Sequence, residues 1–181
     1  MVYLEKQDLA KLFRTIHATN KTHHLISLVC FFAGARISQA LNVRGEDIFQ
    51  REGRWVIKIR GAKRGNAVIH PLHIEDDPAF NMLPLTELAA IRGTSLLFGS
   101  TSRQYFNLCL KKYCAKAGIH TDAGHSHIFR HSVGMQIFRA TQQIGAVSQF
   151  LGHRSSSAAF FYLAVNSQKI GQDAVDNLQL A

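Results

Sequence analysis

The sequence predicts a mostly α-helical protein with one small antiparallel β-sheet, an α+β arrangement. Apolar residues recur at helical spacing along most of the chain, which is typical of amphipathic or buried helices. Only two short runs, residues 55–59 and 67–70, are rich in aromatic and β-branched residues. A basic turn over residues 61–66 joins these runs, and so short a connection favours two antiparallel strands.

Three helices are predicted before the sheet, over residues 5–15, 22–32 and 38–42. Leu9, Leu12 and Ile16 recur at helical spacing in the first helix. The second helix is nearly all apolar, so we expect it to be buried. Gly34 separates the second helix from the third, and Arg36 lies at the start of the third.

The chain after the sheet is also predicted to be mostly helical, with a loop over residues 76–84 and a connection over residues 93–100. Helices are expected over residues 86–91, 102–117, 127–140, 144–151, 155–164 and 167–178. Gly118 is placed to end the helix over residues 102–117. The last helix has an apolar stripe made of Ile170, Ala174, Val175 and Leu178.

Composition points to a folded protein with a polyanionic partner. Apolar residues make up 46% of the 181 residues, which is enough for a core. Lys and Arg outnumber Asp and Glu by 21 to 12, which gives a formal net charge of +9. An excess of this kind favours nucleic acid as a partner ahead of an anionic membrane.

The cysteines and the chain start bear on the compartment. The three cysteines form no CxxC pair and are odd in number, which indicates reduced thiols in a cytosolic protein. The first residues do not have the pattern of a signal peptide. The longest apolar stretch, residues 25–35, is shorter than the about 20 residues that span a bilayer, so membrane insertion is not expected.

The last third of the chain carries a group of residues suited to phosphodiester chemistry. His127 and Arg130 are three apart, so they share a helix face. Arginine offers a planar fork that matches two phosphate oxygens, and histidine moves protons near neutral pH. His153 and then Tyr162 follow, and a tyrosine hydroxyl becomes a nucleophile when a base or positive charge activates it.

Each of these residues also has a simpler interpretation. Tyr162 lies in an apolar segment and fits a core tyrosine, His153 fits a helix cap, and Arg36 fits a surface arginine. His127 and Arg130, each taken alone, fit a surface or capping group. Lys63 lies near the hairpin tip with Arg60 and Arg64, where a solvated basic turn or a non-catalytic contact with DNA phosphates is the alternative. The spacing of the histidines at positions 125, 127 and 131 fits no common zinc pattern, so no metal site is expected.

Taken together, the motifs resemble the tyrosine recombinase (phage integrase) superfamily over residues 5–165. The most specific part is the segment 127–131, the segment 151–154 and Tyr162, nine residues after His153. The segment 35–38, with Leu41 and Asp47, resembles the first-arginine motif of the family. The hairpin segment 63–66, followed by Pro71, resembles its lysine-bearing turn.

The resemblance implies the tyrosine recombinase catalytic-domain fold and a metal-independent reaction without a cofactor. Tyr162 would attack the scissile phosphate and form a 3′-phosphotyrosyl bond, while Arg36 and Arg130 hold its non-bridging oxygens. Lys63 would protonate the leaving 5′ oxygen. His127 would be the acid–base partner of the tyrosine, and His153 would donate a hydrogen bond to the phosphate.

The sequence departs from the family pattern at two points. Gln39 stands where the family usually has an acidic residue, which puts the pose of Arg36 in question. The sequence also begins almost directly at the catalytic domain, without the usual N-terminal DNA clamp. We therefore expect a short member of the family, such as the fimbrial phase-variation recombinases, or a fragment of a longer member.

The same resemblance sets expectations for organisation and partners. Residues 1–165 would form the catalytic domain, and residues 166–181 a tail helix that packs on its own domain or is exchanged between protomers. The partner would be double-stranded DNA, bound as a synaptic homo-tetramer, with a monomer when free, in the cytoplasm at the bacterial nucleoid. Candidate DNA contacts are Arg60, Arg64, Arg103, Lys111, Lys112 and Arg154.

Two alternatives to a site-specific recombinase are open. One is a type IB topoisomerase-like enzyme, which uses similar chemistry without exchanging strands, although the Leu-Gly-His motif and the nine-residue spacing to Tyr162 favour a recombinase. The other is a catalytically weak DNA-binding relative, and Gln39 is the feature that favours it.

Overall fold

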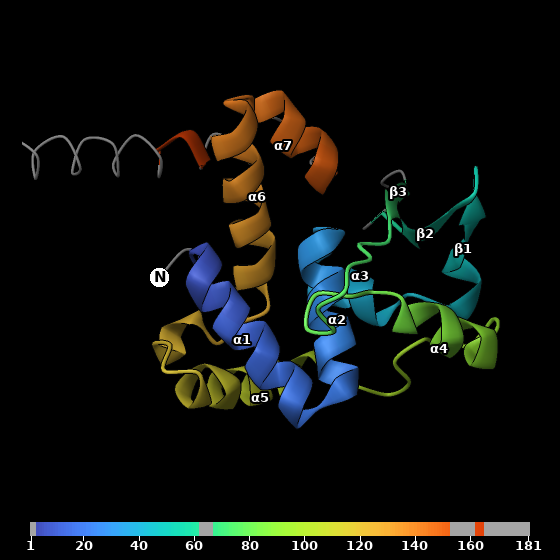
Figure 1. Cartoon of the computed structure of the whole chain (residues 1–181), viewed down its shortest axis with the longest axis horizontal. Coiled ribbons are helices and arrows are strands. Elements are labelled where there is room, and N and C mark those ends of the chain that lie inside the picture. The colour runs from blue at the N-terminus through green and yellow to red at the C-terminus, as the bar shows by residue number, and fades with distance from the viewer. Residues whose placement is uncertain (1–2, 62–66, 153–161, 165–181) are drawn as a thin grey trace, which may run out of the picture. The chain divides into compact units, whose positions relative to one another are not determined.

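The first two helices are antiparallel neighbours joined by a single residue. The computed structural model describes residues 3–61, 67–152 and 162–164, and in it α1 (Lys6–Thr19) is followed by α2 (Lys21–Phe32). Asn20 lies between them, and its side chain accepts a hydrogen bond of 2.8 Å from the backbone N–H of His23. This contact caps α2 in the way that asparagine commonly caps a helix. Figure 1 shows α1 beside both α2 and α5.

An aromatic cluster forms the core between these helices. Phe13 is buried on α1, with its ring centroid 5.5 Å from that of Phe31 and 5.4 Å from that of Phe129. Phe80, from the loop before α4, packs edge-on against Phe13 at 5.8 Å. Such offset and edge-to-face pairs add to the stabilisation from buried area. The cluster therefore joins α1 and α2 to the loop before α4 and to α6, which lie much further along the sequence.

The sheet has three antiparallel strands in the order β1–β2–β3. They are β1 (Ile48–Arg51), β2 (Arg54–Ile59) and β3 (Val68–Pro71). Ile57 is fully buried and pairs with Ile48 on one side and His70 on the other. The two predicted strands are confirmed, whereas β1 was missing from the sequence prediction.

The remaining elements of the described residues are helical; the α-helices were predicted, and the two 3₁₀ turns were not. A short helix α3 (Ile37–Leu41) and a 3₁₀ turn η1 (Gly45–Asp47) precede the sheet, and α4 (Pro84–Arg92), α5 (Arg103–Lys116), a 3₁₀ turn η2 (Thr121–Ala123), α6 (His127–Thr141) and α7 (Ile144–Leu151) follow it. Ser102 caps α5 by accepting a hydrogen bond from the N–H of Tyr105 at 3.1 Å. Gly118 has a φ of +70°, which suits the expected helix end. The predicted fold class, mostly helical with a small antiparallel sheet, is confirmed.

The chain divides into two compact units, Met1–Val133 and Gly134–Ala181. The first unit contains the sheet, α1 to α5 and the start of α6, and the second contains the rest of α6, α7 and a helical turn at residues 162–164. The predicted tail helix over residues 167–178, the predicted domain boundary after residue 165 and most of the helix predicted over residues 155–164 lie outside the described residues.

Two general expectations can be compared with the structure. All three cysteines are free, as predicted, with Cys30 and Cys114 buried and Cys109 half-buried. Throughout the described ranges, each helix is too short or too polar to cross a lipid bilayer.

Candidate active site

Arg130 is a buried charge that is tied to the turn after α2. Its side chain is 4% exposed, and one guanidinium nitrogen donates a hydrogen bond to the carbonyl oxygen of Gly34. Gly34, two residues after the end of α2, has a φ of +56°, a backbone conformation that glycine adopts at little cost. Because Arg36 follows two residues later, this bond connects α6 to the segment that carries the other predicted arginine.

Arg36 occupies the position just before α3 and is half-buried. Its carbonyl oxygen accepts hydrogen bonds from the N–H groups of Gln39 and Ala40, at 2.8 and 2.9 Å. Its own N–H donates to the side-chain oxygen of Gln39 at 3.0 Å. Both the N–H and the carbonyl group of Arg36 are therefore hydrogen-bonded, which fixes the backbone from which its side chain extends.

His127 begins α6 close enough to both arginines to feel their charges. Partial loss of hydration lowers its pKa below the ordinary value of histidine, and the positive charges of His125, Arg130, Arg36 and Arg103 lower it further. The N–H of the preceding residue, Ser126, donates to the side chain of Asn107 at 2.9 Å, which fixes the start of the helix. His127 is therefore neutral at pH 7 and able to accept a proton.

Two further groups next to Arg130 were not identified from the sequence. His70 lies on β3 and is 5% exposed, and burial, followed by the charge of Arg130, lowers its pKa to about 4. Cys30 on α2 is fully buried, and burial raises its pKa to about 12. Both are consequently uncharged at pH 7. The sequence did carry a signal for His70, because a histidine in an otherwise apolar strand is either exposed or held in a polar pocket.

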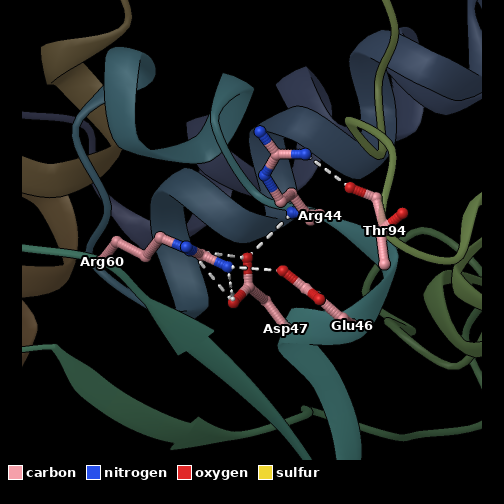
Figure 2. A network of polar contacts seen from close by, with 5 residues as sticks. All are labelled: Arg44, Glu46, Asp47, Arg60 and Thr94. Carbon is pink, nitrogen blue, oxygen red and sulfur yellow. Dashed lines mark hydrogen bonds and ion pairs between the residues drawn. The ribbon is translucent and has the colours of Figure 1, made fainter.

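Arg60, directly after β2, lies in a network with acidic residues that Figure 2 shows from close by. Its guanidinium bonds the carboxylate of Asp47 through three contacts of 2.9–3.2 Å and Glu46 at 2.9 Å. Asp47 is 2% exposed and also accepts the N–H of Arg44 at 3.0 Å. Hydrogen bonding to Asp47 raises the pKa of Arg60. A DNA contact by Arg60 stays a prediction, and a phosphate would compete there with two carboxylates.

Tyr162 belongs to the second unit, where it is buried against Gly134. Its side chain is 2% exposed. A Cβ atom added at Gly134 would lie 2.5 Å from two ring carbons of Tyr162 and 2.6 Å from its hydroxyl oxygen. The ring thus fits into space that only a glycine leaves open.

The other predicted site residues fall into two groups. Lys63, Arg64, His153 and Arg154 lie outside the described residues. Arg103, Lys111 and Lys112 are exposed on α5, where they are free to meet a polyanion. Within residues 3–61, 67–152 and 162–164, histidine, cysteine and carboxylate side chains do not gather in any group of three or more that would hold a metal ion.

The family model of the phage integrase family matches residues 2–169. The chain therefore belongs to the phage integrase family. Curated relatives are tyrosine recombinase XerH of Campylobacter jejuni, 23% identical over 178 residues, and type 1 fimbriae regulatory protein FimE of Escherichia coli K12, 27% identical over 177 residues. The matches cover 93% and 92% of this chain. They span 49% of XerH and 87% of FimE, so the chain is about half the length of the first of these relatives.

Solved structures show the same fold. XerH recombinase bound to its difH substrate, in a pre-cleavage complex, matches with a TM-score of 0.73 and 22% identity, over 90% of this chain and 50% of that chain. The catalytic domain of bacteriophage HP1 integrase matches with a TM-score of 0.67 and 20% identity, over 99% of this chain and 96% of that chain. The fold is therefore that of tyrosine recombinase catalytic domains.

Proposed function

We propose that this chain is the catalytic part of a site-specific DNA recombinase, which cuts and rejoins double-stranded DNA through a 3′-phosphotyrosyl intermediate at Tyr162. The observation that carries the proposal is the arrangement of Arg130, Arg36 and His127 in the first unit. A buried guanidinium is tied beside the segment of a second arginine, and a neutral histidine lies within range of both charges. This arrangement suits a phosphate that gains charge during attack.

The two arginines would stabilise the transition state. Attack turns the scissile phosphate into a pentavalent species with added negative charge on its non-bridging oxygens. Preorganised donors in a site with little water act strongly on such charge, and removing one typically costs ~3–4 kcal/mol. Arg130, being buried and already oriented by the Gly34 carbonyl, has the properties of such a donor.

The remaining groups would handle protons. The Tyr162 oxygen forms a bond to phosphorus while its proton passes to neutral His127, and the bond from phosphorus to the 5′ oxygen breaks. Lys63 gives a proton to that oxygen, and His153 donates a hydrogen bond to the phosphate. A 5′-hydroxyl from a second strand reverses the steps, so no metal ion or energy cofactor is required.

Partners and location follow from this chemistry. Strand exchange needs two duplexes and four cleavages, so a synaptic homo-tetramer on DNA is proposed, with the monomer as the free form. The net charge of +9 supports a polyanionic partner. The proposed location is the cytoplasm, at the bacterial nucleoid.

A covalent-adduct assay tests the proposal. The protein is incubated with nicked duplexes taken from the DNA that flanks its gene, and the products are separated on a denaturing gel. A protein–DNA band is expected for the wild type and for Tyr3→Phe, a matched control at a half-buried position, but not for Tyr162→Phe. DNA binding without an adduct on any duplex would instead indicate a binding protein. Relaxation of supercoiled DNA without strand exchange would indicate a topoisomerase.

A further inference from the structure

Gln39 uses both ends of its amide to connect two segments of the first unit. Its side-chain oxygen accepts the N–H of Arg36 at 3.0 Å, and its side-chain nitrogen donates to the carbonyl oxygen of Arg60 at 2.9 Å. The first partner precedes α3, and the second directly follows β2, 21 residues after Gln39 along the chain. An amide has a donor and an acceptor, so it satisfies both bonds in one orientation.

The Arg60 end of this bridge is itself anchored. Figure 2 shows the Arg60 guanidinium bonded to the carboxylate of Asp47. Asp47 is buried, and the three contacts measure 2.9–3.2 Å. Asp47 is held in turn by the N–H of Arg44, whose side chain donates to the carbonyl of Thr94. Charge-assisted bonds with several contacts resist displacement more than single neutral bonds do. The carbonyl that Gln39 meets therefore belongs to a residue whose own side chain is held by several charge-assisted bonds.

We infer that Gln39 is a positioning residue for Arg36, anchored through the Asp47–Arg60 ion pair, and that a carboxylate cannot replace its amide. An acidic side chain would keep the bond from the Arg36 N–H. Its second oxygen, however, would face the Arg60 carbonyl oxygen, and two acceptors without a proton between them repel each other. The inference rests on the proposed function, because the proposed role of Arg36 is to hold the scissile phosphate.

The test compares Gln39→Glu with Gln39→Met, which has a similar length but neither bonds nor repels the two partners. Single-turnover cleavage of a nicked duplex is measured with the wild type and both variants. We expect cleavage to slow by about ten-fold in Gln39→Met, as for one lost hydrogen bond that orients a reacting group, and to slow further in Gln39→Glu. A Gln39→Glu rate at or above that of Gln39→Met would overturn the inference.

A second substrate separates positioning from damage to the fold. In a duplex with a methylphosphonate at the scissile position, a methyl group replaces one non-bridging oxygen and removes the negative charge. If Gln39 acts through Arg36, we expect the loss in both variants to become smaller on this neutral linkage, and the same is expected of Arg36→Ala. An equal loss on both linkages would mean that Gln39 has only a structural role.

Controls distinguish failure of this inference from failure of the proposed function. Gln50→Glu makes the same chemical change at an exposed position of β1 and is expected to cleave at the wild-type rate. Arg60→Lys keeps one positive charge but loses the multiple contacts with Asp47, and we expect it to slow cleavage on the charged linkage alone. If the wild type cleaves neither duplex, the proposed function fails. If the wild type cleaves and Gln39→Met matches it, only the inference fails.

Discussion

His70 shows how one residue beside a buried charge affects the stability of the whole unit. Its ring is buried on β3 in the field of Arg130, and both effects favour the neutral form. Because His70 is neutral, it places no second positive charge beside the Arg130 guanidinium, and two like charges there would repel each other. The same arrangement makes the folded state sensitive to acid.

We predict that His70→Gln reduces the loss of stability between pH 6.5 and pH 4. The pKa of His70 is about 4 in the folded state, against about 6.5 when unfolded, so the unfolded chain takes up a proton first as the pH falls. The contribution of neutral His70 is thus fully present above pH 6.5 and is lost toward pH 4, by about 2–3 kcal/mol. Glutamine does not titrate in this range.

Urea unfolding at several pH values measures this effect. The pKa of His131 is also lowered to about 4, and its contribution is the same in the wild type and in the variant. The difference between the two curves therefore isolates His70. Parallel curves from pH 6.5 to pH 4 would contradict the prediction.

At the scale of elements, α6 contains a glycine, Gly134, at the point where it packs against the ring of Tyr162. Gly134 lies inside this helix, a position where glycine is usually unfavourable relative to alanine. Its cost is explained by the ring of Tyr162, which occupies the space that a Cβ atom would need. Gly134 therefore lowers the intrinsic stability of α6 but leaves room for the ring of Tyr162, the proposed nucleophile.

We predict that Gly134→Ala destabilises the protein and slows adduct formation. The new methyl group overlaps the Tyr162 ring, and overpacking of this kind typically costs about 1–3 kcal/mol. Gly145→Ala on α7 is the matched control, because a Cβ atom there meets nothing within 4 Å. That control is expected to be neutral or stabilising by roughly 0.5–1 kcal/mol. Thermal unfolding and the adduct assay measure both variants, and equal behaviour would argue against the close contact.

The sequence predicts elements well where a periodic pattern is long or well bounded. The helix α7 has the predicted limits, and α5 differs by one residue at each end because Ser102 and Ala117 are its caps. The strand β1 was missed because the four residues Ile-Phe-Gln-Arg contain too little alternation to be distinguished from a loop. Its pairing with β2 supplies the structure that its own pattern does not indicate.

The candidate site was predictable in part, for a related reason. Motifs with fixed spacing indicated Arg36, His127 and Arg130, and the structure brings these three into range of one another, although their roles stay predictions. The bond between Gln39 and the Arg60 carbonyl was not predictable, because it joins a side chain to a backbone atom across the fold. Asp47 was identified as part of a sequence motif. Its ion-pair partner, Arg60, was not predictable, because the pairing depends on how β2 packs against η1.

At the scale of the whole molecule, the surplus of positive charge sets how the protein meets DNA. The formal net charge of +9 attracts any polyanion, so a general charge effect has to be separated from a defined surface. The exposed Lys111 and Lys112 on α5 allow the two effects to be tested separately. Elsewhere, exposed cations such as Lys11 and Arg51 are paired with neighbouring carboxylates.

We predict that Lys111→Gln with Lys112→Gln lowers the salt dependence of DNA binding. Each phosphate contact contributes about 0.9 to the slope of log affinity against log salt, so the slope should fall by about 1.8 in magnitude. The control Lys11→Gln with Arg51→Gln removes the same charge and is expected to leave the slope nearly unchanged. Titration of a short fluorescent duplex at several salt concentrations measures both. Equal changes in the two double variants would indicate that only net charge matters.

The burial of the cysteines has a practical consequence for observing these events. Burial raises the pKa of Cys30 to about 12 and that of Cys114 to about 11, so neither forms a reactive thiolate near neutral pH. Cys109 is half-buried on α5, two residues before Lys111. A maleimide dye should therefore attach selectively at Cys109 in the native protein. The wild-type chain thus offers a built-in reporter position beside the surface proposed to contact DNA.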